Sequence, residues 1–288
     1  DQARARVDRE RETQGSQRRE AWESWCKKER SSSGKKQIYH FCQDSHQGAI
    51  PVMRTEEGHL TGDYSTMDAL LRTEWEPTFN LYTSLPRPTW EAFHAEYSSV
   101  FPRTCPRQQA RLTPARLLEV LNNMDPNTGL GPDSWRVREL RKLPHALLQR
   151  LCDLLELIEH TGKWPKSLAL GLISPLTKGE GLGAGDVRPI TVTSVVYRLW
   201  AACRVRELIE WQETWLSSCI SSYRPNAGCE DIWLAQSLAI EQALLFNEPI
   251  AGISLDFAKA FDRVPVHILL ELASTLGVSP GIVTGLKG

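Results

Sequence analysis

The chain has 288 residues, of which 41% are hydrophobic and 24% charged, and its formal net charge is −1 at neutral pH. This balance excludes an intrinsically disordered chain and predicts one large or two ordinary globular domains. No apolar run approaches the roughly 18 residues that a membrane-spanning helix needs, so we expect no membrane partner.

The near-zero net charge hides a local asymmetry. Residues 1–36 hold 11 Lys and Arg against 7 Asp and Glu, and residues 102–150 hold 9 against 4. Basic surfaces of this kind attract phosphates even where the total charge is neutral. The pattern permits a nucleic-acid partner without requiring one.

The 7 cysteines are widely spaced and form no Cys-x-x-Cys pair, which is typical of a reducing, intracellular compartment. Cys26, His40, Cys42 and His46 lie close together but match no zinc-finger spacing, so we expect ordinary half-buried residues there. The sequence begins at Asp1 with neither an initiator Met nor a secretory signal, and it ends in what reads as the middle of a domain. We therefore interpret it as an excerpt of a longer polypeptide.

Residues 1–36 are charged and poor in aliphatic side chains, which favours a solvated helix or a linker. The alternative is a basic arm that follows phosphates, with Trp22 and Trp25 available to pack or stack. Further on, a turn at Gly58 is followed by apolar residues at helical spacing, which predicts a helix. These residues are Met67, Leu70, Leu71, Trp75 and Phe79.

Two helices in the middle of the chain are predicted from their ends as well as from their apolar faces. Thr113 can cap a helix N-terminus, and Pro114 suits the first helical position. A longer helix is expected over His145–Gly162, ended by the glycine and carrying one apolar stripe. That stripe consists of Leu147, Leu148, Leu151, Leu154, Leu155 and Ile158.

A β-hairpin is predicted after Pro165, where two short strand-like segments flank a glycine-rich turn. The turn has neither of the glycine spacings of known phosphate-binding loops, so it is only weak evidence for phosphate binding. A helix is expected to follow from Thr193 or Ser194 and to run over Val195–Trp215.

Ile250–Val264 carries the clearest chemical signal. Ile253, Leu255 and Phe257 alternate with small or polar residues, which predicts a strand with one buried face and with Asp256 on the other. The run Ala-Lys-Ala-Phe-Asp then leaves the strand through a turn or short helix. A half-exposed strand with a merely solvated Asp256 is the alternative that fits the alternation alone.

The segment SLDFAKAFDRV, which ends at Val264, resembles the first catalytic motif of reverse transcriptases of the non-LTR, LINE-like retrotransposon type. The resemblance implies that Asp256 is catalytic and binds both metal ions, with the backbone carbonyl of Phe257 as a further ligand. It also implies that Phe261 is the gate against the ribose 2′-hydroxyl. Viral RNA polymerases keep an acidic residue at this position, whereas a phenyl ring accepts no hydrogen bond, which favours deoxynucleotides.

Three further segments resemble the same family. PLTKGEGLGAGDVRPI is similar to its fingers hairpin, which implies that Lys178 and Arg188 bind the incoming triphosphate. GLGPDSWRVRELRKLP is similar to the base of the fingers, with Ser134 where the family usually has Gly. In a third segment, SYRPN, the resemblance leaves Arg224 as a substrate contact or as an ion-pair partner of Asp231. The segment GLGPDSWRVRELRKLP also contains four basic residues: Arg136, Arg138, Arg141 and Lys142. Two alternatives stay open for them, contact with template phosphates or a solvated helix face.

The resemblance implies an α+β, right-hand polymerase fold that is incomplete, with a helical N-terminal extension. The implied reaction adds deoxynucleoside triphosphates to a DNA primer on an RNA template, with two Mg²⁺ ions, or Mn²⁺, as cofactor. The expected place of action is intracellular, in the nucleus, and the oligomeric state is left open. The expected regions are a charged arm or linker over 1–36, an N-terminal extension over 37–105, fingers over 106–249 and the start of the palm over 250–288.

One carboxylate cannot hold two Mg²⁺ ions, and the sequence contains no second aspartate motif, so we expect the excerpt itself to be inactive. Two alternatives stay open. One is a polymerase-fold scaffold that binds RNA without catalysis, and the other is a helical interaction protein with a chance motif.

Overall fold

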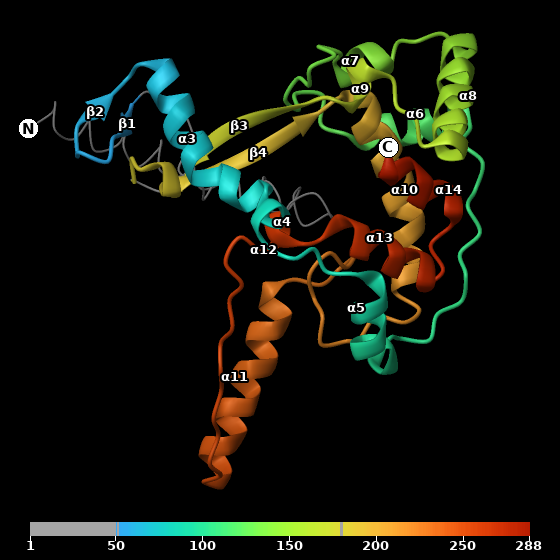
Figure 1. The fold of residues 1–288 in the computed structure, drawn as a ribbon. Coiled ribbons are helices and arrows are strands. Elements are labelled where there is room, and N and C mark those ends of the chain that lie inside the picture. Colours follow the sequence, from blue (N-terminus) through green and yellow to red (C-terminus); the bar gives the residue numbers. More distant parts are fainter. Residues whose placement is uncertain (1–49, 51, 179–180) are drawn as a thin grey trace, which may run out of the picture. The chain divides into compact units, whose positions relative to one another are not determined.

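The structure is a computed structural model that describes residue 50 and residues 52–178 and 181–288 (Figure 1). All of these belong to one of the two units of the chain, Ile50–Gly288. The expectations for the 1–36 arm and for the Cys26, His40, Cys42 and His46 group lie outside the described residues. The described elements are β1 (Met53–Arg54), β2 (Leu60–Thr61), α3 (Tyr64–Phe79), α4 (Leu81–Ser84), α5 (Trp90–Tyr97), η1 (Ser98–Val100), α6 (Pro114–Asn123), α7 (Val137–Leu140), α8 (His145–Thr161), α9 (Lys166–Ala169), β3 (Gly171–Thr177), η2 (Ala184–Asp186), β4 (Val187–Thr193), α10 (Val195–Gln212), α11 (Cys229–Phe246), α12 (Ala260–Arg263), α13 (Val266–Thr275) and α14 (Pro280–Lys287).

The main hydrophobic core lies between α6, α8 and α10, and α14 packs along α8 (Figure 1). The predicted helix starts are confirmed, because Thr113 Oγ1 accepts a hydrogen bond from the backbone N–H of Arg116 and Ser194 Oγ accepts one from that of Tyr197. Gly162 ends α8 in the left-handed conformation, at a φ of 68°. The largest buried apolar side chains of this core include Leu117, Leu121, Leu148, Leu155, Leu199 and Trp200.

The buried face of α8 differs from the predicted stripe at one edge. Leu147 is exposed, whereas Cys152 and Glu159 face the core beside Leu148 and Leu155. Residues three or four apart share a helix face, so these four form one stripe and Leu147 lies to its side. A glutamate within the stripe is the feature that the apolar pattern could not predict.

The predicted hairpin is confirmed. Strands β3 and β4 pair antiparallel, with a register that runs from Gly171 opposite Thr193 to Thr177 opposite Val187. The second strand leads directly into α10 through the cap residue Ser194. The hairpin is therefore fixed at one end to the main core.

A second, smaller core covers the other end of the hairpin. Val187, the first residue of β4, is buried together with Met53 of β1 and Met67 of α3. The predicted helix over this region is confirmed by α3, and Gly58 forms the predicted turn at a φ of 88°. The segment that runs from β1 to α3 thus packs against the turn end of the hairpin.

The predicted strand at Ile253–Phe257 is not formed. The backbone from residue 251 to residue 257 has no regular structure, and Ile253 and Phe257 are 88% and 76% exposed. A strand needs a hydrogen-bonded neighbour, and neither of the two sheets among the described residues includes this segment. The short helix predicted after it is confirmed as α12.

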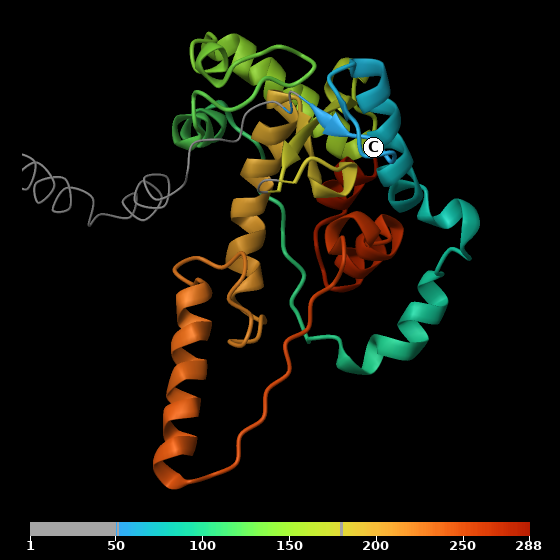
Figure 2. The same ribbon diagram turned by 90° about the vertical axis from the view of Figure 1, so that its left-hand side faces the viewer.

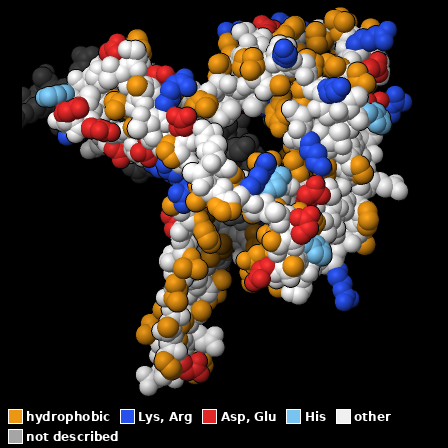
Figure 3. All heavy atoms as spheres, in the orientation of Figure 1, with side chains coloured by type: hydrophobic (Ala, Val, Ile, Leu, Met, Phe, Trp, Pro, Cys, Tyr) orange, Lys and Arg blue, Asp and Glu red, His pale blue; other side chains and the backbone are white. Residues whose placement is uncertain are grey.

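Helix α11 precedes this segment in the chain (Figure 2). It is apolar on most of its surface, yet nearly all of its side chains are exposed (Figure 3). The exposed residues include Trp233, Leu238, Leu244, Leu245 and Phe246. Among the described helices, none combines the length and the apolar character that crossing a bilayer would need.

Candidate functional site

Asp256 and Phe261 lie on either side of one turn. Asp256 is exposed on the irregular segment before α12, and Phe261 lies within α12 with 79% of its surface exposed. The chain turns at Lys259, the residue before α12, whose φ is 51°. The carboxylate and the ring are therefore both accessible, five residues apart on a short solvent-facing stretch.

Lys259 anchors this turn, although the resemblance implies no role for it. Its Nζ lies 3.0 Å from Glu74 Oε1 and 3.3 Å from Thr78 Oγ1, both on α3. The same ammonium group lies 4.1 Å from the centroid of the Trp75 ring, a cation–π distance. The only sequence signal for this contact is the spacing of Glu74, Trp75 and Thr78 on one helix face.

Lys178 and Arg188 lie on one face of the hairpin. Arg188 is directly opposite Leu176, and Lys178 follows Leu176 by two residues, a spacing that puts alternate side chains on the same side. The Lys178 N–H donates to the Asp186 carbonyl at 2.6 Å, which continues the pairing by one step. Both side chains are exposed, and neither has a hydrogen bond or ion pair to another described residue.

The basic cluster near α7 divides into one structural residue and three accessible ones. Arg141 donates to the carbonyls of Leu121 and Met124 at 2.7 to 3.0 Å, so it holds the C-terminal end of α6. The other members, Arg136, Arg138 and Lys142, are exposed. Template contact thus stays open as a hypothesis for these three, whereas the guanidinium of Arg141 is already used within the fold.

Arg224 serves its own loop. Its guanidinium pairs with Glu213, with Nη2 to Oε2 at 2.6 Å, and also donates to the Ser217 and Ile220 carbonyls. The hydrogen bond to Glu213 raises the pKa of this arginine above its ordinary value. The alternative pair with Asp231 is not formed; the Asp231 carboxylate instead accepts the Gly228 N–H at 2.7 Å at the start of α11.

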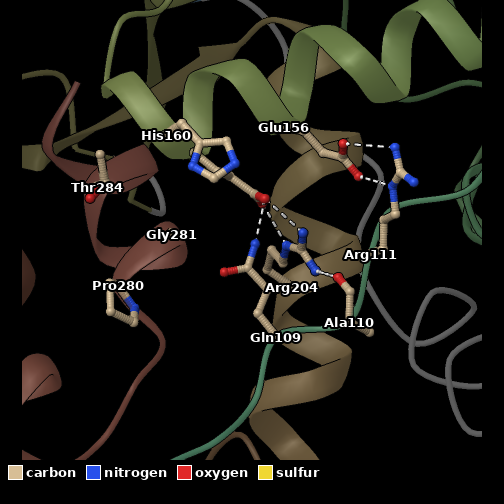
Figure 4. A pocket seen from close by; sticks show the side chains of 10 residues that line it. Gln109, Ala110, Arg111, Glu156, His160, Arg204, Pro280, Gly281 and Thr284 are labelled. Atoms are coloured by element: carbon tan, nitrogen blue, oxygen red, sulfur yellow. Dashed lines mark hydrogen bonds and ion pairs between the residues drawn. The ribbon is translucent and has the colours of Figure 1, made fainter.

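A separate pocket, with a volume of about 500 Å³, lies where residues 109–111 pass α8, α10 and α14 (Figure 4). Its buried wall is an ionic network centred on Glu159. The carboxylate of Glu159 accepts hydrogen bonds from Arg204, from Trp200 Nε1 at 2.6 Å and from Gln109 Nε2. Both oxygens already have donors in the fold, so this acid has no free role in catalysis.

The described residues do not make a divalent-metal site by themselves. No group of three or more His, Cys, Asp or Glu side chains among them is placed to hold a metal ion. Mg²⁺ takes near-octahedral oxygen coordination, and a site for two such ions needs several carboxylates. Asp256 alone does not fit this requirement.

The two thiols that are buried among the described cysteines are not nucleophile candidates. Burial raises the pKa of both Cys152 and Cys203 to about 11, so each stays protonated near neutral pH. They contribute to the core beside Leu155 and Leu199.

No protein-family model and no curated protein sequence matches the chain.

Proposed function

We propose that this chain forms the fingers and the first part of the palm of an RNA-directed DNA polymerase of the non-LTR retrotransposon type. The observation that carries the proposal is the placement of Asp256 and Phe261, both exposed, on the two sides of the Lys259 turn. A carboxylate with no partner among the described residues, followed five residues later by an exposed ring, supports the proposal. The partners are an RNA template, a DNA primer and deoxynucleoside triphosphates, and the site of action is the nucleus.

The hairpin supplies the second part of the proposal. Lys178 and Arg188 are two accessible cations on one face, with no competing described carboxylate bound to either. Two such groups can neutralise the outer phosphates of a nucleoside triphosphate, and a guanidinium binds phosphate oxygens in pairs. Their role is to bind and orient the triphosphate.

Phe261 supplies sugar selection. Its ring offers bulk and no hydrogen-bond acceptor, so a ribose 2′-hydroxyl placed against it would lose its water partners without gaining a new one. Deoxyribose avoids this cost. Phe261 therefore selects deoxynucleotides by excluding the ribose 2′-hydroxyl.

The carboxylate of Asp256 is not sufficient for two-metal chemistry. We propose that further acidic side chains must come from outside this sequence, and that residues 1–288 alone bind nucleic acid weakly and incorporate no nucleotide. Primer extension by residues 1–288 would contradict this assignment.

The decisive experiment is primer extension with an RNA template, a DNA primer, deoxynucleotides and Mg²⁺, performed on a longer polypeptide that contains this chain and a second aspartate motif. Asp256→Asn should reduce synthesis to background, because it removes a negative charge without changing the size of the side chain. The matched control is Glu248→Gln, an exposed acid in the same connecting segment, which should retain synthesis. Equal activity of the two variants would refute the proposal.

The same assay separates the two alternatives. A scaffold of polymerase fold would bind the RNA template and incorporate nothing even in its unsubstituted form. A helical interaction protein would do neither, and the exposed apolar residues of α11 are the observation that favours this reading.

A further inference from the structure

One face of α3 reaches two parts of the proposed site. Residues at helical spacing along this face divide into an apolar half and a half that binds Lys259. The apolar half, Met67, Leu70 and Leu71, packs in the small core with Val187 of the hairpin. The second half consists of Glu74, Trp75 and Thr78.

The contact at the Lys259 end is partly shielded from water. Trp75 and Thr78 are each 6% exposed, and the Lys259 side chain is 25% exposed. An ammonium group held at once by a carboxylate, a hydroxyl and an aromatic face has less freedom than one in an exposed ion pair. Tyr82 adds a second, longer contact, from its hydroxyl to the Arg263 carbonyl at 3.5 Å, at the far end of α12.

This contact fixes the direction of the turn before the gate. Lys259 has a left-handed backbone, at a φ of 51°, which L side chains rarely adopt, and α12 begins at the next residue. Phe261 belongs to the single turn of α12. Because Phe261 follows Lys259 by only two residues, the contact of Lys259 with α3 restricts where the backbone of Phe261 lies.

Helix α3 and the strand before it also lie close to the hairpin turn. The Arg54 N–H, on the strand that precedes α3 in the same small core, donates to the Leu182 carbonyl in the hairpin turn at 2.9 Å. A Cβ added at Gly185 in that turn would lie 3.9 Å from Glu74 Oε1, the same oxygen that binds Lys259. Helix α3 is thus in contact with the hairpin turn and with the turn before α12.

We propose that Lys259 is a positioning residue for sugar selection: clamped on Glu74, Trp75 and Thr78 of α3, it holds Phe261 in register with the triphosphate-binding hairpin. This role rests on the proposed function, because the position of Phe261 matters only if the hairpin binds a triphosphate. The contact of Lys259 with Glu74, Trp75 and Thr78, which we call the clamp, can be measured without catalysis. The substrate group concerned is the 2′ position of the incoming nucleotide.

The first experiment uses the 288-residue chain and measures its rate of cleavage by chymotrypsin after Phe261, which lies within α12. Lys259→Met keeps most of the length of the side chain and removes its charge, and should accelerate cleavage after Phe261 by about tenfold, since the turn must open before the protease can bind it. Lys259→Arg can still bind Glu74 and stack on Trp75, and should cleave at the unsubstituted rate. The matched control is Arg72→Met, which removes a cation that pairs with Asp68 on the same helix and should leave the rate unchanged.

Unchanged cleavage of Lys259→Met would overturn the clamp, whatever the activity of the protein. Glu74→Gln provides the second variant, and it should accelerate cleavage in the same way because it weakens the partner rather than the turn itself. Equal acceleration by Arg72→Met would also overturn the clamp, since it would indicate a general loosening of α3.

The second experiment uses the longer polypeptide and compares kcat/KM for deoxynucleotides with kcat/KM for ribonucleotides. A loss of folded protein lowers both values by the same factor, so their ratio is insensitive to a merely structural role. Lys259→Met should lower this ratio by roughly tenfold, within the range expected for small misplacements of a substrate-contacting group. Lys259→Arg should restore it.

The two hypotheses fail in different ways. Absence of synthesis by the unsubstituted polypeptide would refute the proposed function and leave the proteolysis result standing. Synthesis with an unchanged sugar ratio in Lys259→Met would refute the positioning role and leave the proposed function standing.

Discussion

Arg204 binds Glu159 inside the main core through two hydrogen bonds, from Nε to Oε1 at 2.6 Å and from Nη2 to Oε2 at 2.8 Å. The two side chains are 2% and 5% exposed, and they join α10 to α8. Arg204 also donates to the Ala110 carbonyl (Figure 4). It donates to Glu207 as well, so its charge is compensated from three directions. Such a pair specifies how the helices meet, because removing one partner leaves the other charge buried.

We expect Glu159→Ala to lower the free energy of unfolding by about 3–5 kcal/mol, the range measured when one partner of a buried ion pair is removed. Denaturant unfolding, followed by fluorescence, gives the value. The control is Arg150→Ala, whose ion pair with Asp153 is long, at 3.7 Å, and exposed, and which should cost no more than about 0.5 kcal/mol. Similar losses in the two variants would contradict a structural role for the network.

Substitution of Ser134 by glycine is expected to raise the free energy of unfolding. The φ of Ser134 is 56°, and its N–H donates to the Gly131 carbonyl at 3.0 Å in the turn before α7. A residue with a Cβ is strained in this region, so Ser134→Gly should stabilise the chain by about 0.5–1 kcal/mol after the greater flexibility of unfolded glycine is subtracted. Ser134→Ala keeps the Cβ and should bring no gain. If both variants stabilise equally in thermal unfolding, the strain is absent.

The cap of α3 makes stability depend on pH. Asp63 Oδ2 accepts hydrogen bonds from Ser65 Oγ, Thr66 Oγ1 and the Thr66 N–H, and these lower the pKa of Asp63 from 3.8 to about 2, with Ser65 the largest contributor. A carboxylate whose pKa is lower in the folded state stabilises the fold at pH values above its unfolded-state pKa. This contribution is lost as the pH falls through the folded-state pKa. The window is therefore from about pH 4 down to about pH 2.

The matched variant is Asp63→Asn, which retains a capping oxygen but does not titrate. At neutral pH it should have a lower Tm than the unsubstituted chain, and the difference should shrink as pH falls through this window. Parallel Tm curves for the two proteins between pH 5 and pH 2 would contradict the cap as the source of the pH dependence.

The cap residues also show which features the sequence predicts. Thr113, Ser194 and Gly162 act on atoms within four residues, so their signals are local and were predicted correctly. Ser134 differs from them, because its positive φ is also local but a serine does not predict it.

The missed features depend on partners far along the chain. Lys259 and Glu74 are separated by 185 residues, and Arg204 and Glu159 by 45, so no local pattern identifies which residue is the partner in either contact. The strand at Ile253–Phe257 was predicted wrongly for a related reason, since alternation shows which side chains could share a face but not whether a neighbouring strand is present.

Phe261→Ala tests the proposed sugar gate directly. Removing the ring should raise kcat/KM for ribonucleotides relative to deoxynucleotides by about tenfold or more in the longer polypeptide, because nothing then excludes the 2′-hydroxyl. Phe246→Ala is the control, since this exposed ring lies on α11, outside the motif, and should not change the ratio. An unchanged ratio in Phe261→Ala would show that another residue selects the sugar.

The hairpin cations predict a change in nucleotide affinity that is independent of the base. Arg188 and Lys178 lie on one face because Leu176, opposite Arg188, precedes Lys178 by two residues. Each charge-assisted hydrogen bond to phosphate contributes about 1.5–3 kcal/mol, so Arg188→Gln or Lys178→Gln should raise KM roughly tenfold to a hundredfold. The four deoxynucleotides should be affected equally, since they share the triphosphate.

The control is Lys166→Gln, which changes an exposed lysine just before the hairpin and should leave KM unchanged. A base-dependent effect, or none, would remove Arg188 and Lys178 from the triphosphate site.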